Sequence, residues 1–145
     1  IFSALLRDDR EDEPEKRDNL IPFFLPFLHL HCGIQLYDKL QLLKELVEAK
    51  QQGGKVVAIG AAAKGNTLLN YCGIDSSLVD FATDVSPLKI GKYTPGSHIL
   101  IRADEDIDGT VTHALILAWN LADFLKGKIS PKHPKLRFIT PHVLE

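Results

Sequence analysis

The residues of this chain that could do chemistry are concentrated in a glycine- and alanine-rich segment at 60–67, Gly-Ala-Ala-Ala-Lys-Gly-Asn-Thr. The segment follows an apolar run at 55–59, Lys-Val-Val-Ala-Ile. A buried parallel strand that ends at a glycine and turns into a helix presents backbone N–H groups, and the positive end of the helix dipole, to an anion. The pattern therefore predicts a site for an anionic ligand, of which phosphate is the usual example.

The spacing within this segment argues against two common nucleotide sites. In a Walker A loop the lysine follows the second glycine, whereas here Lys64 precedes Gly65, so magnesium-nucleotide hydrolysis is not expected. The dinucleotide-binding motif has a second glycine two positions after the first, and this chain has Ala62 there. Asp84, which ends an apolar run, still lies where a ribose-binding acid is expected. Binding of a nicotinamide dinucleotide is thus weakened but remains open.

Extended to Ile74, the segment resembles the signature of the C-terminal domain of S-adenosylmethionine-dependent sugar C-methyltransferases. These enzymes add a branching methyl group to nucleotide-linked keto-deoxysugars. The resemblance covers roughly residue 34 to the C-terminus. It is also carried by Asp84 with Ser86 and Pro87, by Lys92-Tyr93, by Pro95-Gly96-Ser97-His98-Ile99 and by Leu115-Ile116-Leu117-Ala118-Trp119-Asn120.

The resemblance implies a nucleotide-diphosphate sugar as ligand, with dTDP as its nucleotide, and a division of the chemistry. A base would remove the proton beside the keto group of the sugar, and the enolate would attack the methyl group of S-adenosylmethionine. The base and the donor would belong to an upstream methyl-donor domain. Neither that domain nor the family's small zinc-binding domain is recognisable in this sequence. We therefore expect no cofactor within this chain, and no catalysis by it alone.

Within this reading, the backbone amides at the start of the predicted helix point at the diphosphate. Lys64 supplies a mobile charge, and Asn66 and Thr67 donate further hydrogen bonds. The structural alternative is that the alanines of the segment simply allow a helix to pack closely on a strand.

Five residues outside the segment are further candidates. Asp84 could accept a hydrogen bond from a sugar hydroxyl, or could cap the turn before Ser-Pro. Tyr93 and His98 lie on a glycine-proline loop beside strand ends, where His98 is either a titrating group or structural. Trp119 offers an apolar wall or a stacking face for a pyrimidine, and Asn120 could reach the base or sugar or cap a helix.

The predicted binding residues are therefore Gly60, Ala61, Ala62, Ala63, Lys64, Gly65, Asn66, Thr67, Asp84, Tyr93, His98, Trp119 and Asn120. No catalytic residue is assigned, and His98 is the one candidate.

The elements that must position these residues alternate between helices and strands. A helix is predicted at 34–52, with Leu36, Leu40, Leu43 and Val47 at helical spacing and a glycine stop at 53–54. Strands are predicted at 55–59, 78–82, 98–101, 113–118 and 136–139, helices at 65–72 and 120–126, a helical turn at 103–109, and a loop at 86–97. This order predicts a Rossmann-like three-layer α/β sandwich with a mostly parallel sheet of about five strands.

The composition predicts one domain. The chain has 145 residues, 45% of them hydrophobic, which suits a single core. The net charge of -2 argues against a general nucleic-acid surface. The longest apolar stretch, at 20–30, is too short and too rich in proline to span a bilayer, so no membrane partner is expected. With two cysteines, a reducing cytoplasmic setting is predicted, with burial of Cys72 as a thiol.

The first 33 residues are predicted to be a linker and irregular arm, as a remnant of an upstream domain, whereas residues 34–145 form the nucleotide-sugar-binding domain. Dense mixed charge at 7–19 predicts a solvated linker. The cluster of His29, His31 and Cys32 lacks the spacing of a structural zinc site, so no metal is expected. The chain has no methionine, so the sequence is interpreted as a piece of a longer polypeptide.

Two other functions remain open. One is a stand-alone NAD(P)- or CoA-binding domain. The other is an interaction module that has lost its ligand, with the helix at 34–52 and the aromatic arm at 20–30 as docking surfaces. Binding of dTDP, of a dinucleotide or CoA, or of none of them separates the three hypotheses.

Overall fold

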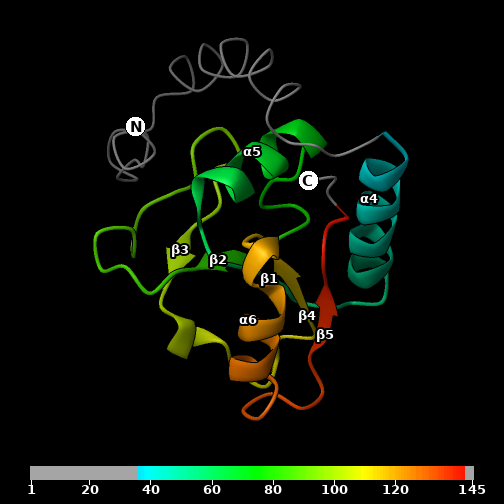
Figure 1. Ribbon diagram of the computed structural model, residues 1–145. Helices are drawn as coiled ribbons and strands as arrows, with labels where there is room; N and C mark the ends of the chain where they lie inside the picture. The colour runs from blue at the N-terminus through cyan, green and yellow to red at the C-terminus, as the bar shows by residue number, and fades with distance from the viewer. Residues whose placement is uncertain (1–35, 143–145) are drawn as a thin grey trace.

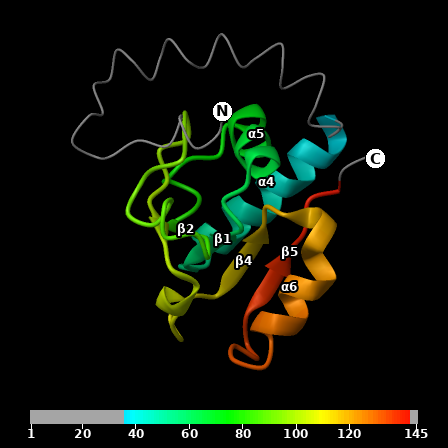
Figure 2. The ribbon, with the colours of Figure 1, turned by 60° about the vertical axis from the view of Figure 1, so that its left-hand side comes forward.

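The computed structural model describes residues 36–142, which form a parallel sheet of five strands covered by helices on both faces (Figures 1 and 2). The strands are β1 Val56–Ile59, β2 Phe81–Thr83, β3 Ile101–Arg102, β4 His113–Ile116 and β5 Arg137–Ile139. The helices are α4 Leu36–Gln51, α5 Ala63–Cys72 and α6 Ala122–Ile129, with 3-10 turns η2 Asp104–Asp106 and η3 Trp119–Leu121. The predicted fold class is confirmed.

The strand order is β3-β2-β1-β4-β5, with every pair parallel. β1 is therefore central, with Val57 level with Phe81 of β2 on one side and with Ala114 of β4 on the other. The chain moves outward from β1 to β3 in one direction, then returns to add β4 and β5 on the other side. Because the direction reverses between β1 and β4, the loops after these two strands form the topological switch point of the sheet, where ligands of open α/β sheets usually bind.

The core consists of one layer on each face of the sheet. All four residues of β1 are buried, and they alternate between the layers: Val56 and Ala58 face α4 and α5, whereas Val57 and Ile59 face the side of α6. Figure 2 shows α6 on the opposite side of the sheet from α5. Cys72 is buried in the first layer, as predicted. Within the described residues, no helix is long and apolar enough to cross a membrane.

Helix α4 packs through a different line of residues from the predicted one. The buried positions are Leu42, Leu46 and Ala49, whereas Leu40 and Val47 are 54% and 40% exposed. Both lines have helical spacing, and α4 carries leucine on more than one side. The helical period therefore left open which line meets the sheet. The predicted glycine stop is confirmed, because Gly53 has a φ of 74° and donates to the carbonyl of Lys50.

Several element boundaries differ from the predicted ones. β2 begins at Phe81 rather than at 78, because the N–H groups of Leu78 and Val79 donate to the carbonyl of Asp75 in a turn. β3 begins at Ile101 rather than at 98, because His98 has a positive φ of 51°. The predicted loop at 86–97 is confirmed as turns without a helix.

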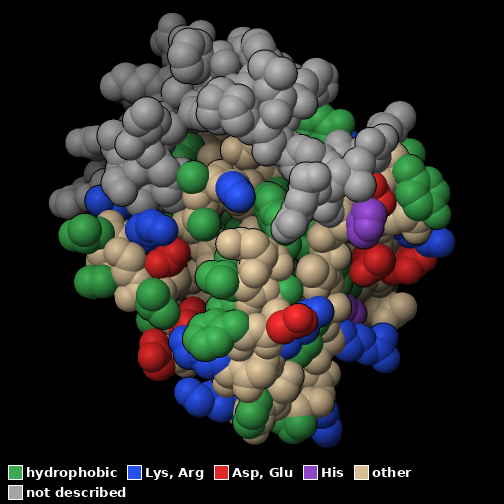
Figure 3. All heavy atoms as spheres, viewed as in Figure 1, with side chains coloured by type: hydrophobic (Ala, Val, Ile, Leu, Met, Phe, Trp, Pro, Cys, Tyr) green, Lys and Arg blue, Asp and Glu red, His purple; other side chains and the backbone are tan. Residues whose placement is uncertain are grey.

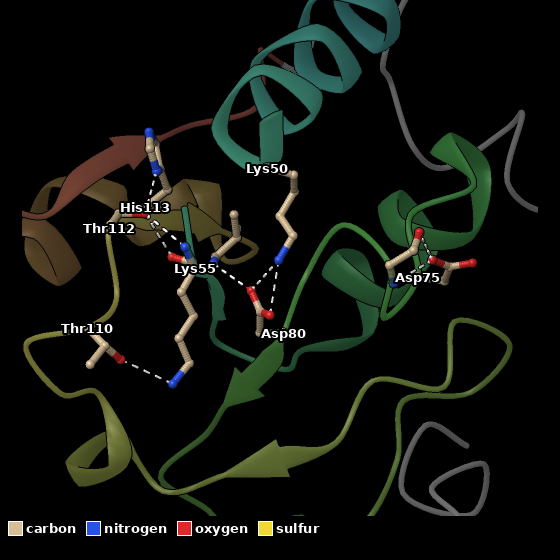
Figure 4. Close-up of polar contacts among 9 residues, drawn as sticks. Lys50, Lys55, Asp75, Asp80, Thr110, Thr112 and His113 are labelled. Atoms are coloured by element: carbon tan, nitrogen blue, oxygen red, sulfur yellow. Dashed lines mark hydrogen bonds and ion pairs between the residues drawn. The ribbon is translucent and has the colours of Figure 1, made fainter. Parts of the chain in front are cut away.

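Asp80, at the amino edge of the sheet, joins three elements (Figure 4). Its carboxylate accepts a 2.7 Å hydrogen bond from the N–H of Val56, which opens β1. It also accepts bonds of 2.9 and 3.0 Å from the ammonium group of Lys50 in α4. Since Val56 is fully buried, the Asp80 oxygen satisfies an N–H group that water does not reach.

His113, the first residue of β4, gives a pH-dependent prediction. Burial, and then the positive charge of Arg137, hold the pKa of His113 below its ordinary value of 6.5. The folded state thus binds fewer protons here than the unfolded state, so stability falls as the pH drops from about 6.5 through the folded-state pKa. Urea unfolding at about pH 7.5 and about pH 5 should show this loss, and His113→Gln should reduce it. Equal losses in both proteins would contradict the assignment to His113.

Candidate functional site

The turn after β1, residues 60–62, is called here the glycine loop, and it lies at the carboxyl edge of the sheet. Gly60 has a φ of 83°, a conformation that side chains disfavour. The N–H groups of Gly60 and Ala61 donate to the carbonyl of Thr83, at 3.0 and 3.1 Å. Thr83 ends β2, so the glycine loop is fixed to the neighbouring strand before α5 begins.

Helix α5 begins without a side-chain cap. Its N-cap residue is Ala62, whose side chain makes no capping hydrogen bond, and the first turn holds no acid. Asn66 is the first residue of α5 whose N–H reaches back to a carbonyl, that of Ala62. Among the described residues, no hydrogen bond involves the N–H groups of Ala63, Lys64 or Gly65. These N–H groups and the positive end of the helix dipole are thus available to an anion.

Lys64 adds a charge to this helix start. Its side chain is exposed, and no hydrogen bond or ion pair of its ammonium group with another described residue is present. The next residue, Gly65, is buried: a Cβ there would lie 2.5 Å from the Cβ of Leu117. Only a glycine lets the first turn of α5 approach the chain after β4 so closely.

The loop after β4 lies beside the glycine loop. The N–H of Leu117 donates to the carbonyl of Ile59, and a Cβ on Gly60 would lie 3.2 Å from that of Ala118. The following residue, Trp119, is partly buried against the core. The fold therefore brings Trp119 and the glycine loop to the same switch point between β1 and β4.

Asn120 is exposed at this edge, inside η3. It is not the N-cap of α6, because that position belongs to Leu121, which makes no side-chain cap. The predicted helix start at 120 was two residues early, since a 3-10 turn comes first. A role of Asn120 in ligand binding stays a prediction.

Asp84 follows β2 at the same edge, and both of its carboxylate oxygens have partners. Oδ1 accepts a 2.8 Å hydrogen bond from the N–H of Ser86, as expected for the turn-capping alternative. Oδ2 lies 3.1 Å from the ammonium group of Lys89. The Asp84 side chain is 11% exposed. An acid so engaged is poorly placed to bind a ribose, so the geometry does not favour the dinucleotide alternative.

Two buried polar atoms near the glycine loop lack partners among the described residues: Oδ1 of Asn66 and Oγ1 of Thr83. Asn66 is 5% exposed, so its side chain points into the protein rather than to solvent. Thr67, predicted as a further donor, bonds the carbonyl of Ala63 at 3.2 Å. Of the three polar side chains predicted in this turn, Lys64 is therefore the most accessible.

The loop that carries Tyr93 and His98 is held against the later part of α5. Asn70 of α5 donates to the carbonyls of Asn66 and Pro95, both at 2.9 Å. The rings of Tyr93 and His98 stack with centroids 4.2 Å apart and planes within 5°. Among the described residues, His98 is the one non-glycine residue with positive φ. Strained backbone of this kind is enriched at functional sites, but a catalytic His98 remains a prediction.

The structure thus brings the glycine loop, the start of α5, Asp84 and Trp119 to one edge of the sheet. Sequence reasoning missed Lys89 and Asn70. The sequence shows a lysine, Lys89, five positions after Asp84, but it does not show which groups that lysine would bond. Figure 3 shows this face of the molecule, with exposed hydrophobic side chains over the loop after β2 and over the start of α6.

Comparison with known families matches residues 36–141 to the C-methyltransferase C-terminal domain. The match covers nearly all of the described residues. The chain belongs to this family. The family predicted from the segment at 60–74 is therefore confirmed.

A C-methyltransferase of known sequence agrees with this membership. Over 82 residues, the chain is 43% identical to C-methyltransferase NovU from Streptomyces niveus. This alignment covers 55% of the chain and 20% of NovU. The aligned part of the chain thus spans about a fifth of the length of that relative. The prediction that His29, His31 and Cys32 bind no metal concerns residues outside those that the structure describes.

Proposed function

We propose that this domain binds the diphosphate of a nucleotide-sugar substrate at the start of α5. The observation that carries the proposal is the uncapped helix start after the central strand, with Lys64 in its first turn. Three unpaired N–H groups, the dipole and a lysine favour an anion with several oxygens, and the family membership makes a sugar nucleotide the fitting one. Trp119, in the neighbouring loop after β4, offers a face for the base.

In this proposal the domain binds and orients substrate, while the methyl donor is bound elsewhere in the complete enzyme. S-adenosylmethionine supplies an electrophilic methyl group in such reactions. Its ribose would need an accessible acid after β2, and Asp84, paired with Lys89, does not fit that role. The residues of this edge therefore do not fit S-adenosylmethionine. The contribution of this chain is to position the substrate. Holding two reactants in the right geometry by itself accelerates the reaction between them.

The donor domain is proposed to close over this same edge of the sheet. Val85 and Leu88, in the loop after β2, and Leu121 and Phe124, around the start of α6, are exposed hydrophobic residues. Apolar side chains on both sides of the proposed diphosphate site suit a protein partner that covers the bound substrate. We also propose a cytoplasmic setting for the complete enzyme, as predicted from the two cysteines of this chain.

Lys64→Ala should weaken dTDP binding by about 10- to 100-fold, because it removes a charge-assisted hydrogen bond to phosphate. The exposed side chain makes no contact that folding needs, so the melting temperature should be unchanged. Isothermal titration with dTDP and a dTDP-sugar measures the affinity, with NAD as the ligand control.

Lys135→Ala is the matched control, since Lys135 is an exposed lysine in the turn before β5 at the opposite edge of the sheet. It should bind dTDP as the wild type does. Equal affinity of the Lys64→Ala variant and the wild type would remove Lys64 from the site. No saturable heat with dTDP in the wild type, together with heat from NAD, would replace the proposal by the dinucleotide alternative.

A further inference from the structure

Lys89 connects the loop after β2 to the glycine loop. Its ammonium group donates a 2.9 Å hydrogen bond to the carbonyl of Ala61 and a 3.1 Å bond to Oδ2 of Asp84. The side chain is 20% exposed and that of Asp84 11%. Both bonds are thus largely shielded from water, where charged hydrogen bonds are stronger.

The Lys89 ammonium group completes the attachment of the glycine loop to β2. On one side, the N–H groups of Gly60 and Ala61 are fixed by the carbonyl of Thr83. On the other side, the carbonyl of Ala61 is fixed by Lys89. Together these bonds fix the three successive peptide groups between Ile59 and Ala62 that lead into α5. The direction in which the first N–H groups of α5 point depends on the orientation of these peptide groups.

We propose that Lys89 is a positioning residue for the diphosphate site, a role that rests on the proposed function. It holds the glycine loop so that the start of α5 faces the ligand, and it neutralises Asp84. Without the ammonium group, the Asp84 carboxylate and the Ala61 carbonyl would face each other as two unscreened acceptors. Their repulsion would displace the loop, and an uncompensated negative charge would lie near the phosphates.

The test is titration of the 145-residue chain with dTDP and with dTMP. Lys89→Met keeps the length of the side chain and removes its charge. It should raise the dissociation constant for dTDP about tenfold. It should also reduce the ratio of the dTMP dissociation constant to the dTDP dissociation constant, because the site would bind the second phosphate less well. Lys89→Arg keeps the positive charge and hydrogen-bond donors. It should therefore retain most of the affinity for dTDP and most of the preference for dTDP over dTMP.

Lys92→Met is the matched control, because Lys92 belongs to the same loop and its side chain has no described polar partner. It should behave as the wild type. The inference is overturned if Lys89→Met binds dTDP as tightly as the wild type. It is equally overturned if dTDP and dTMP weaken by the same factor with a lower melting temperature, which is a general structural effect. Failure of the wild type itself to bind dTDP would instead overturn the proposed function.

Discussion

Replacing Gly65 with valine should destabilise the domain by about 3 kcal/mol, at the upper end of what overpacking costs. The added Cβ would lie 2.5 Å from the Cβ of Leu117, with further Leu117 atoms at 3.2 and 3.3 Å. Leu117 is fully buried, so it has no free space to move into. Helix α5 would have to shift away from the sheet, which would also displace the proposed diphosphate site.

Gly127→Ala provides the control for this substitution. Gly127 lies inside α6, and nothing is within 4 Å of a Cβ added there. Alanine in an unobstructed helix position should stabilise the protein by up to about 1 kcal/mol. Urea unfolding followed by circular dichroism measures both variants. A Gly65→Val protein as stable as the wild type would show that α5 does not need this close approach.

Asp80→Ala should cost about 2–3 kcal/mol of stability. The main reason is that the N–H of Val56, in a fully buried residue, loses its acceptor, and an unsatisfied buried donor costs about 1–3 kcal/mol. The ion pair with Lys50 adds less, because the side chains of Lys50 and Asp80 are 28% and 32% exposed, so that water partly screens their charges. The free energy of unfolding from urea titration measures the sum.

Two variants separate these contributions. Asp80→Asn keeps an oxygen that can accept from Val56 and removes the charge that attracts Lys50, so it should cost less than half as much as Asp80→Ala. Asp106→Ala, at an exposed position in η2, should leave stability within about 0.5 kcal/mol. Equal losses for Asp80→Asn and Asp80→Ala would mean that the ion pair, rather than the hydrogen bond drawn in Figure 4, provides the stability.

The sequence alone predicted the strand, turn and helix at 55–72 closely, because the signals for these elements are local. A continuous apolar run marks a strand buried on both faces. Gly60 and Gly73 then mark the two ends of the next element, and both adopt a positive φ. The same local pattern was sufficient to indicate the family, since it lies in one uninterrupted stretch of chain.

Local signals were weaker where structure depended on a turn or on distant partners. The strand predicted at 98–101 became two residues at 101–102, since the Thr94–Ser97 turn and the backbone of His98 occupy the preceding positions. In α4, both the predicted and the observed apolar lines have a helical period. Packing against β1 and α5 decided that Leu42 and Leu46 are buried while Leu40 is exposed.

The sequence by itself thus determined the α/β class, the position of the glycine loop and the family, because each depends on neighbouring residues. The tertiary structure decided that Asp84 is paired with Lys89, that Lys89 holds Ala61, and that Gly65 meets Leu117. These contacts join separate elements of the chain. Which side chain reaches which partner depends on how strands and helices are packed, and no local pattern contains that information.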